Sequence, residues 1–488
     1  MSVAKSERRH YDVIVVGSGS GATIVNNALY QGMQVAWVDK GPLGGTCLNV
    51  GCIPSKILIF PADRVMQIME AGKLGVDAEI REIDFEAIMA RMRRMVSQSR
   101  NDIREGLHTA PNLDFYEAEG HFLASEEHGR EGQEMSDIPA MEVGDEVISA
   151  PNVIIASGAR PRIPPIEGLD EVSYLTNENV LDLRERPESL TIIGGGYISV
   201  EYAHFFSAMG TRVTIMQRND RLVPDEEPEV SELLEKKLSE RMDVYTHTEV
   251  IEVAQVEDSI EGKPSISVVG RDRYDDERRE VVTAEVMVAA GRRSNADLLR
   301  VENAGIETDE RGYIKVNEYL ETNVENVWAL GDATGRHMFK HVANREASIV
   351  WHNFAHDHKV PMDYSAVPHA VFSHPQIASV GMTEAEAAAE HDILVGKAKY
   401  LDVAKGQAMM ETDGFAKAIV ERGSPQSHGG GKILGFHIIG PHAPILIQEV
   451  VNVMADDAPP GAVGQGMHIH PALPEVVVSA LYNLREPR

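Results

Sequence analysis

Cysteine is almost absent from this chain: its 488 residues include only two, Cys47 and Cys52. Two cysteines exclude the disulfide framework of small secreted domains and a zinc site built from cysteine alone. Only four residues separate them, so they cannot cross-link distant segments. In a cytosolic protein, a close pair of this kind indicates catalysis.

Long apolar runs are also missing. The apolar stretches have the length of strands and are broken by glycine or polar residues, whereas a membrane span needs about 20 apolar residues. The N-terminal sequence MSVAKSERRHYDVIVVG is polar and leads directly into a strand, without the apolar core of a secretory signal. We therefore expect no membrane span and a cytoplasmic location.

Positive charge is in deficit, with 76 Asp and Glu against 46 Lys and Arg and a formal net charge of -30. Nucleic acid is therefore not expected as a partner. Acidic residues form short patches, such as 225–227 and 275–277. The pattern resembles the hydrated surface of proteins from a halophile, where salt relieves self-repulsion. An acidic enzyme from an ordinary cytoplasm is the alternative.

The length of the chain predicts two or three domains, and its 43% hydrophobic content makes them globular. Segments beginning at residues 11 and 191 each predict a strand, a glycine turn, a helix and a second strand. Two such folds should bind two nucleotides. From about residue 365, alternating strand and helix patterns predict a separate domain. The expected fold class is α/β, with two Rossmann-like nucleotide-binding domains and a C-terminal α+β domain.

The first glycine fingerprint consists of Gly17, Gly19 and Ala22, with Asp39 at the end of the next strand. The first glycine allows a tight turn, the second lets the backbone approach a pyrophosphate, and the small third residue lets helix pack on sheet. The helix N-terminus favours phosphate, and Asp39 can accept from a ribose hydroxyl. A glycine-rich turn without a ligand is the alternative, and the motif alone does not distinguish FAD from NAD.

The two cysteines lie in the segment GGTCLNVGCIPSK, residues 44–56. A helix N-terminus at this place would favour thiolate over thiol. The segment resembles the redox-active segment of the pyridine nucleotide-disulfide oxidoreductase family, which includes glutathione reductase and dihydrolipoamide dehydrogenase. The resemblance implies that Cys52 lies beside FAD and that Cys47 attacks a substrate disulfide. Two incidental cysteines on a helix are the alternative.

The family resemblance implies a glutathione reductase-like fold in four parts. These are residues 1–160 (first part of the FAD-binding domain), 161–290 (NADPH-binding domain), 291–364 (second part of the FAD-binding domain) and 365–488 (dimerisation domain). It also implies an ion pair between Lys56 and Glu201 near the flavin, where positive charge stabilises reduced flavin. Further FAD-binding residues expected on this basis are Lys40, Gly45, Thr46, Ser157, Gly158, Gly331 and Asp332.

The second glycine fingerprint is Gly194, Gly196 and Ser199. Where an NAD enzyme places an acid after the next strand, this chain has Gln217 and Arg218, followed by Arg221. Guanidinium groups bind a 2'-phosphate that a carboxylate would repel, so we expect NADPH as the second cofactor. Arginines on a surface loop are the alternative. The other NADPH-binding residues expected are Tyr197, Ile198, Gly291 and Arg292.

Near the C-terminus, His470 is followed by proline and, five residues after the histidine, by Glu475. Histidine suits proton exchange with a thiol near neutral pH, and a carboxylate fixes its tautomer. In the family, this segment reaches the disulfide of the other subunit. We therefore expect an obligate homodimer with shared sites, in which electrons from NADPH reach the Cys47–Cys52 disulfide by way of FAD.

The substrate is expected to be a low-molecular-weight disulfide. Residues 17–21, 340–344 and 470–477 resemble mycothione reductases, while the acidic composition resembles halophilic archaeal enzymes that reduce bis-γ-glutamylcystine. We expect bis-γ-glutamylcystine. The alternatives are a dihydrolipoamide dehydrogenase, which uses NAD, and the flavoprotein subunit of a 2-oxoacid dehydrogenase complex. Mercuric reductase is disfavoured because the chain ends in LREPR, without a second redox pair.

Two further patterns imitate binding sites. His352, His356 and His358 have a helical spacing that could hold a metal, but they lack a nearby cysteine or paired acid, so we expect no metal. The sequence GGGK at residues 429–432 imitates a phosphate loop but lacks its Ser or Thr, and it predicts a hairpin.

Overall fold

The computed structural model describes residues 8–107, 110–124, 139–260, 263–423 and 431–487. The chain divides into two compact units, each built from three separate segments. The first unit comprises Met1–Pro54, Ala90–Arg162 and Gly291–Met362, and the second comprises Ser55–Met89, Ile163–Ala290 and Asp363–Arg488.

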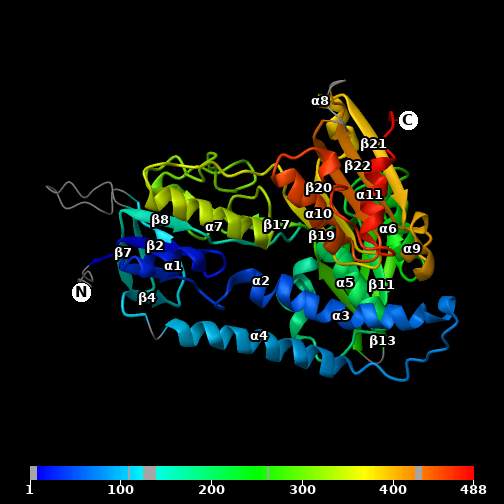
Figure 1. Cartoon of the computed structure of the whole chain (residues 1–488). Helices are drawn as coiled ribbons and strands as arrows, with labels where there is room; N and C mark the ends of the chain where they lie inside the picture. The colour runs from blue at the N-terminus through cyan, green and yellow to red at the C-terminus, as the bar shows by residue number, and fades with distance from the viewer. Residues whose placement is uncertain (1–7, 108–109, 125–138, 261–262, 424–430, 488) are drawn as a thin grey trace. The chain divides into compact units, whose positions relative to one another are not determined.

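A five-stranded parallel sheet forms the centre of the first unit, in the order β18-β8-β2-β3-β4. Strands β2, β3 and β18 are buried apolar runs, as expected where both faces of a parallel sheet are covered, while the edge strand β4 is partly exposed. Helix α1 packs on β2 and β3 and lies beside α7 (Figure 1). The bounds are β2 Val13–Val16, α1 Gly21–Tyr30, β3 Val35–Val38, β4 Leu113–Tyr116, β8 Asn152–Ile155, β18 Val327–Ala329 and α7 Lys340–Ala355.

Smaller sheets complete the first unit. A four-stranded sheet has the order β1-β7-β6-β5, and β9 pairs antiparallel with β17. Both the large sheet and this four-stranded sheet contribute to one apolar core, which includes Ile14, Phe122, Met141 and Val153. The bounds are β1 Arg9–His10, β5 Gly120–Phe122, β6 Ala140–Val143, β7 Glu146–Ser149, β9 Ala159–Pro161 and β17 Arg292–Ser294.

The second unit contains another parallel sheet, in the order β12-β11-β10-β16. Helix α5 packs on β10 and β11, and a three-stranded antiparallel sheet, β13-β14-β15, lies next to it in sequence. The bounds are β10 Ser189–Ile193, α5 Tyr197–Ala208, β11 Arg212–Met216, α6 Pro228–Ser239, β12 Asp243–Tyr245, β13 Thr248–Ile260, β14 Lys263–Asp272, β15 Arg278–Thr283 and β16 Glu285–Val288.

The cysteines lie at the start of a long helical region. Helix α2 spans Gly45–Asn49, α3 spans Cys52–Met69, and α4 spans Phe85–Leu107. Among the described residues, Gly45–Met69 is the one segment whose length and composition would suit a membrane span. Part of this segment is buried in the protein, including Leu58, Ile59 and Ala62, and 39% of its apolar window is buried in all.

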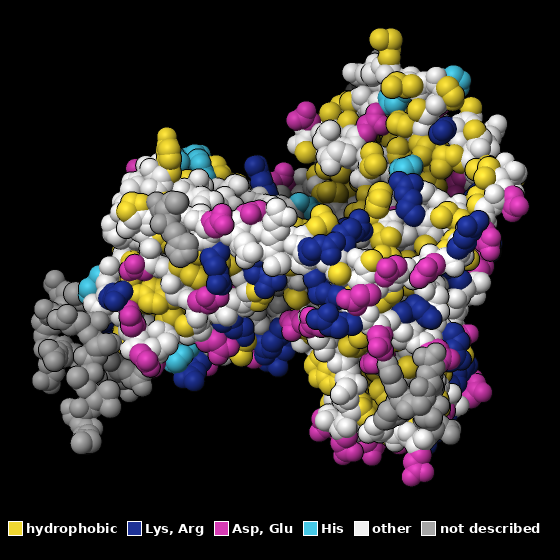
Figure 2. Space-filling model, turned by 90° about the horizontal axis from the view of Figure 1, so that it is seen from below, with side chains coloured by type: hydrophobic (Ala, Val, Ile, Leu, Met, Phe, Trp, Pro, Cys, Tyr) yellow, Lys and Arg dark blue, Asp and Glu magenta, His cyan; other side chains and the backbone are white. Residues whose placement is uncertain are grey.

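Charged side chains of both signs share the surface. On the face shown in Figure 2, Lys and Arg side chains lie among Asp and Glu. Exposed pairs such as Arg293 with Asp297 and Lys315 with Glu307 illustrate this mixture. Positive side chains therefore occur throughout this surface although acidic residues outnumber them.

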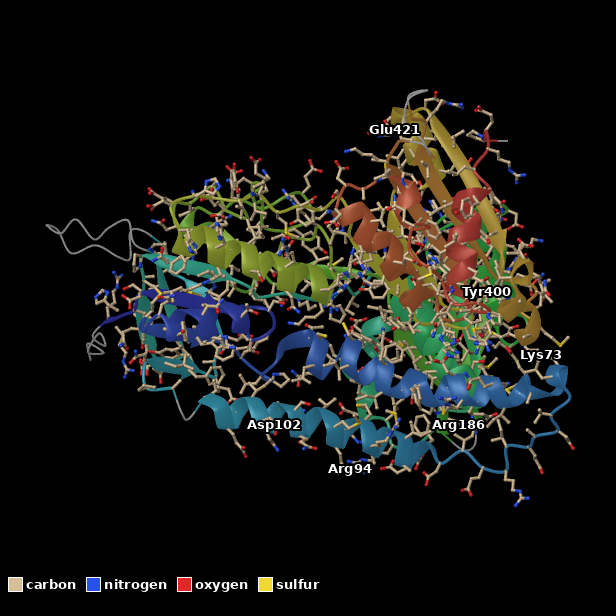
Figure 3. All side chains as sticks on the ribbon, in the orientation of Figure 1. Lys73, Arg94, Asp102, Arg186, Tyr400 and Glu421 are labelled. Carbon is tan, nitrogen blue, oxygen red and sulfur yellow. The ribbon has the colours of Figure 1, made fainter. Side chains whose placement is uncertain are left out.

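The C-terminal sheet is antiparallel, in the order β19-β20-β23-β22-β21, and α10 and α11 pack against it. Tyr400 is fully buried beside this sheet, and its hydroxyl donates to the Pro441 carbonyl at 2.8 Å (Figure 3). A Cβ at Gly440 would come 2.6 Å from its ring, so only glycine fits there. The bounds are β19 Pro368–Val371, β20 Ile377–Gly381, α8 Glu384–Glu390, β21 Ile393–Lys399, α9 Ala404–Met409, β22 Phe415–Glu421, β23 Ile433–Ile439, α10 Ala443–Ala455 and α11 Pro474–Tyr482.

The predicted fold class is confirmed. Both glycine fingerprints follow a strand of a parallel sheet and precede a helix, and the C-terminal part is an α+β unit with an antiparallel sheet. Strands β22 and β23 flank the GGGK segment and pair antiparallel, while Gly429 and Gly430 lie outside the described residues. The four domain boundaries stay a prediction.

Candidate active site

The first glycine turn is forced by close backbone packing. Gly17 has φ +102°, and a Cβ there would lie 2.1 Å from the carbonyl oxygen of Ala156. A Cβ on Gly21 would lie 3.0 Å from the Val15 side chain, so the close contact between helix and sheet is made at Gly21. Ala22, which we expected to make it, is only half-buried. The turn therefore has the tight geometry that the motif predicted.

Asp39 closes this turn from the neighbouring strand. Its carboxylate accepts from the backbone N–H of Ser18 at 2.5 Å and from that of Gly41 at 2.7 Å. Lys40, expected at the flavin, pairs on the surface with Glu119 at 3.0 Å. Asp39 thus fixes the conformation of the loop that precedes α1.

The cysteine segment lies directly against the same turn. Ser18 Oγ accepts from the Gly44 N–H at 2.9 Å, and a Cβ on Gly45 would come 2.8 Å from the Cα of Gly19. The buried Asn49 amide donates to the carbonyls of Pro42, Leu43 and Gly45 at 2.8–3.1 Å. Asn49 was not among the predicted site residues, although a polar residue within an apolar helical pattern can indicate such a role.

The two cysteines are thiols placed at helix N-termini. Cys47 belongs to the short helix α2, which ends before Gly51, and Cys52 begins α3. A Cβ on Gly51 would lie 2.9 Å from the Thr46 carbonyl oxygen, so glycine is needed at this break. The distorted turn between the cysteines brings the two side chains into hydrogen-bonding contact.

This contact changes the acidity of Cys47. The hydrogen bond from the Cys52 thiol lowers the pKa of Cys47 to about 7, against the opposing effect of burial. The charge of Lys340 and the backbone N–H groups of Cys52 and Ile53 lower it further. Those N–H groups belong to the first turn of α3, where a helix stabilises negative charge. The pair is therefore suited to nucleophilic attack near neutral pH.

Four more residues expected to bind FAD lie in the first unit. Asp332 lies at the start of a short 3-10 helix, and burial raises its pKa in spite of the nearby Arg292 and Lys340 charges. Arg292, which we assigned to NADPH, has its Nε 3.5 Å from an Asp332 carboxylate oxygen. The Ser157 hydroxyl is buried and, among the described residues, lacks a hydrogen-bond partner. Gly158 has φ +69° with open space around it, and Gly331 has φ +65°.

The second glycine turn repeats the construction of the first in the second unit. Gly194 has φ +116°, and a Cβ there would lie 2.4 Å from the Ala289 carbonyl oxygen. Gly196 caps α5 and faces open space, followed by Tyr197 and Ile198 in the first turn. Gly291 also faces open space, but it belongs to the first unit.

The residues expected at a 2'-phosphate divide into two kinds. The Gln217 side chain is buried, packs where a Cβ on Gly195 would lie, and donates to the Arg221 carbonyl at 3.2 Å. Arg218 is exposed and Arg221 is half-buried. Neither guanidinium is held in an ion pair within the described ranges. Gln217 therefore shapes the loop, while the two arginines remain available to an anion.

Lys56 and Glu201 form the expected ion pair inside the second unit. The Lys56 Nζ lies 2.6 and 2.8 Å from the two oxygens of Glu201, whose side chain is 5% exposed. The Phe372 N–H donates to the same carboxylate at 3.0 Å, and its ring lies under the ammonium. The pair is thus buried and well satisfied.

His470 and Glu475 also lie together. The Glu475 carboxylate is 2.8 Å from His470 Nδ1 and accepts from the Ala472 N–H at 2.9 Å. The hydrogen bond from His470 lowers the pKa of Glu475. His470 is 72% exposed, and Nε2 is the nitrogen that Glu475 leaves available. His468 has both ring nitrogens engaged, with Glu449 and with the Gly466 carbonyl.

Two groups of residues resemble metal ligands, and in each the candidate atoms lie close to other protein groups. The ring nitrogens of His352 and His356 lie 3.0 Å from the carbonyls of His358 and His352. Glu227, Glu229 and Glu384 have suitably close oxygens within the described part of the chain, but the Lys417 ammonium lies 2.6–3.1 Å from all three.

Comparison with known proteins agrees with this geometry. Residues 11–347 match the family model described as pyridine nucleotide-disulphide oxidoreductase, and residues 367–481 match its dimerisation domain. The chain belongs to the pyridine nucleotide-disulphide oxidoreductase family. It is therefore an oxidoreductase with the glutathione reductase-like fold.

Relatives cover nearly the whole chain of this family member. A mycothione reductase of Mycobacterium tuberculosis is 37% identical over 97% of this chain and 99% of the relative. A dihydrolipoyl dehydrogenase of Bacillus subtilis is 33% identical over 96% and 97%. The solved Cu(II) complex of the HOCl-induced flavoprotein disulfide reductase RclA of Escherichia coli has a TM-score of 0.81 and 26% identity, covering 97% and 99%.

The family uses FAD and a pyridine nucleotide, and the first unit of this member fits FAD. The tight turn at Gly17 precedes a helix N-terminus, which suits a pyrophosphate. The buried Ser157 hydroxyl, unpaired within the described residues, needs a partner that a polar ligand can supply. The donor set therefore agrees with the cofactor of the family.

Proposed function

We propose that this protein is an NADPH-dependent flavoprotein that reduces a low-molecular-weight disulfide, bis-γ-glutamylcystine, to two molecules of γ-glutamylcysteine. The observation that carries the proposal is the Cys47–Cys52 dithiol, in which a neighbouring thiol and a helix N-terminus lower the pKa of Cys47 to about 7. A thiolate available at neutral pH is the group that attacks a disulfide.

FAD would be held by the first unit and, when bound, would supply the two electrons of the nucleotide to the cysteine pair. Residues proposed to hold it are Gly17, Gly19, Ala22, Asp39, Gly45, Thr46, Ser157, Gly158, Gly331 and Asp332. Lys56, paired with Glu201, would place positive charge near the flavin. The boundaries proposed for the FAD, NADPH and dimerisation domains are those expected from the sequence.

NADPH is proposed over NADH because of the loop after β11. Arg218 and Arg221 carry the positive charge there, and the Gln217 amide braces the loop at the position where an NAD enzyme has an acid. Guanidinium groups bind a phosphate through charge-assisted hydrogen bonds.

The proposed chemistry uses a second copy of the chain. The Cys47 thiolate attacks one substrate sulfur, the substrate S–S bond breaks, and the departing thiolate takes a proton from His470 of the second subunit. The Cys52 thiol then gives its proton to His470 and attacks the Cys47 sulfur; the bond between Cys47 and the substrate sulfur breaks, the Cys47–Cys52 disulfide forms, and the second product thiolate leaves with the proton held by His470. Glu475 would orient His470 throughout. The dimerisation domain supports a homodimer with shared sites.

The substrate assignment combines two observations. Full-length similarity to a mycothione reductase supports a disulfide of a small thiol. The net charge of -30 supports a high-salt cytoplasm, for which we propose bis-γ-glutamylcystine as the physiological disulfide. The relative named dihydrolipoyl dehydrogenase supports lipoamide as the competing substrate.

A substrate panel tests the proposal. The purified flavoprotein, in molar KCl and in dilute buffer, is mixed with NADPH or NADH and with bis-γ-glutamylcystine, oxidised glutathione, mycothione or lipoamide. We expect the highest kcat/KM with NADPH and bis-γ-glutamylcystine. Turnover of lipoamide alone, or equal rates with NADH, would overturn the proposed substrate or cofactor. A Cys47→Ser variant that still produces thiol would overturn the mechanism.

A further inference from the structure

Lys340 occupies an anchored position at the start of α7. Its ammonium donates to Ser20 Oγ at 3.0 Å, and the Ser20 hydroxyl donates to Asn344 Oδ1 at 2.9 Å. Asn344 lies one turn further along α7, so two residues of this helix hold Ser20 between them. The half-buried ammonium is therefore fixed at the point where α1 begins.

The residues beside Ser20 contact the cysteine segment. Gly19 and Gly45 approach so closely that a Cβ on Gly45 would lie 2.8 Å from the Gly19 Cα, and Gly44 donates to Ser18. The anchor on Ser20 thus holds the ammonium next to the segment that carries Cys47. Its charge acts on both sulfur atoms.

Three anionic or ionisable groups surround the Lys340 ammonium, namely Cys47, Cys52 and Asp332. Asp332 is the carboxylate that acts on the pKa of Lys340, and its carboxylate also lies 3.5 Å from the Arg292 Nε. Burial lowers the pKa of Lys340, while Cys47, Cys52 and Asp332 act in the opposite direction. The two cysteines act on the Lys340 pKa more strongly than Asp332 does, and Asp332 also pairs with Arg292.

We propose that Lys340 is a positioning residue whose ammonium, anchored on Ser20, stabilises the thiolate of the Cys47–Cys52 pair. This role rests on the proposed disulfide reductase function and adds a residue to its site. Removing the charge shifts ionisation of the pair to higher pH, because nearby positive charge favours the anionic form. Attack on a disulfide then slows at neutral pH and recovers at alkaline pH.

The test is the pH profile of cysteine alkylation. The flavoprotein is reduced, freed of reductant and treated with iodoacetamide between pH 5 and 10, and peptide mass spectrometry follows Cys47 and Cys52 separately. The variants are Lys340→Met, which keeps an apolar stem, and Lys340→Arg, which keeps the charge. Lys315→Met is the matched control, because Lys315 is an exposed lysine of the same unit paired with Glu307.

We expect the alkylation midpoint of Cys47 in Lys340→Met to rise by roughly one pH unit, which slows alkylation at pH 7 about five-fold. Lys340→Arg and Lys315→Met should retain the wild-type midpoint. Ser20→Ala removes the anchor but not the charge, so its Cys47 midpoint should rise less. It replaces Lys340→Met as the test if that variant does not fold. An unchanged midpoint in a folded Lys340→Met or Ser20→Ala protein overturns the inference.

The outcome is separable from that of the substrate panel. A shifted midpoint in a protein that reduces none of the four disulfides would leave the role of Lys340 intact and overturn the proposed function. If the wild-type protein reduces bis-γ-glutamylcystine and the alkylation midpoint of Lys340→Met is unshifted, the proposed function stands and the role of Lys340 is overturned. Flavin absorbance and circular dichroism of each variant show whether the fold and the bound cofactor are retained.

Discussion

Replacing Cys52 with alanine isolates the interaction that contributes most to the acidity of Cys47. In the structure the Cys52 thiol donates to the Cys47 sulfur, and this bond is the largest influence that lowers the pKa of Cys47 to about 7. The first-turn N–H groups of α3 and the Lys340 charge would remain in the variant, as would the opposing effect of burial. The change therefore removes one contribution and leaves the others.

The size of the effect follows from the fraction ionised. At pH 7 a thiol with a pKa of about 7 is half thiolate, whereas one with the ordinary value of 9.0 is about one-hundredth thiolate. Complete loss of the stabilisation would reduce the thiolate fraction about fifty-fold. Because Lys340 and the backbone donors persist, we expect Cys52→Ala to raise the midpoint by about one unit and to lower the fraction at pH 7 about five-fold.

The assay is iodoacetamide alkylation of Cys47 as a function of pH, with Cys52→Ser as the companion variant. Serine keeps a hydroxyl that can donate to the sulfur, so its midpoint should lie between those of wild type and Cys52→Ala. The thiolate is the reactive form, so reactivity increases as pH rises through the pKa. A midpoint that stays near pH 7 in Cys52→Ala would refute the assignment of the hydrogen bond as the main cause.

Three further predictions concern the other contacts. Glu475→Gln should lower kcat for disulfide reduction about ten- to hundred-fold without changing flavin reduction by NADPH, because in the proposed mechanism only the proton transfer by His470 depends on this carboxylate; stopped-flow kinetics of the two half-reactions checks this. Arg221→Ala should raise KM for NADPH about ten-fold and leave KM for NADH unchanged, measured by steady-state kinetics. Lys417→Met should destabilise the protein by about 3 kcal/mol, because it removes the ammonium that pairs with the buried Glu227 carboxylate; denaturant unfolding at pH 7 measures this loss.

The glycine turns could be predicted because their cause is local. Gly17 and Gly194 are required by a strand that turns directly into a helix, and that requirement is visible in a short stretch of sequence. The third position was harder to predict. Spacing indicated Ala22, but the closest packing occurs at Gly21, since the direction in which the first helical turn faces the sheet depends on the tertiary structure.

Contacts between distant residues could be predicted only through the family resemblance. Lys56 and Glu201 are 145 positions apart, and their pairing follows from no local pattern. The family resemblance predicted this ion pair, and the two side chains form it in the structure. Lys340 and Ser20, which are 320 positions apart, were part of segments noted for their resemblance, but nothing in those segments indicated that they would form a hydrogen bond.

The role of Gln217 in the loop after β11 was predicted only in part. The absence of an acid at Gln217 suggested NADPH, and Gln217 itself was expected to take part in binding. In the structure its amide is buried and holds the Arg221 carbonyl, so it acts on the loop from within. Such a role depends on the neighbouring turn at Gly195, which leaves room for the amide because it has no side chain.

A net charge of -30 acts against a thiolate, because surface carboxylates favour the protonated thiol. That influence is spread over a large surface, and at molar salt the Debye length falls to about 3 Å, so it reaches the cysteines weakly. The Lys340 ammonium is half-buried and anchored on Ser20, and salt screens it far less. Local contacts, first the Cys52 hydrogen bond and then the Lys340 charge, therefore lower the pKa of Cys47 in spite of the acidic surface.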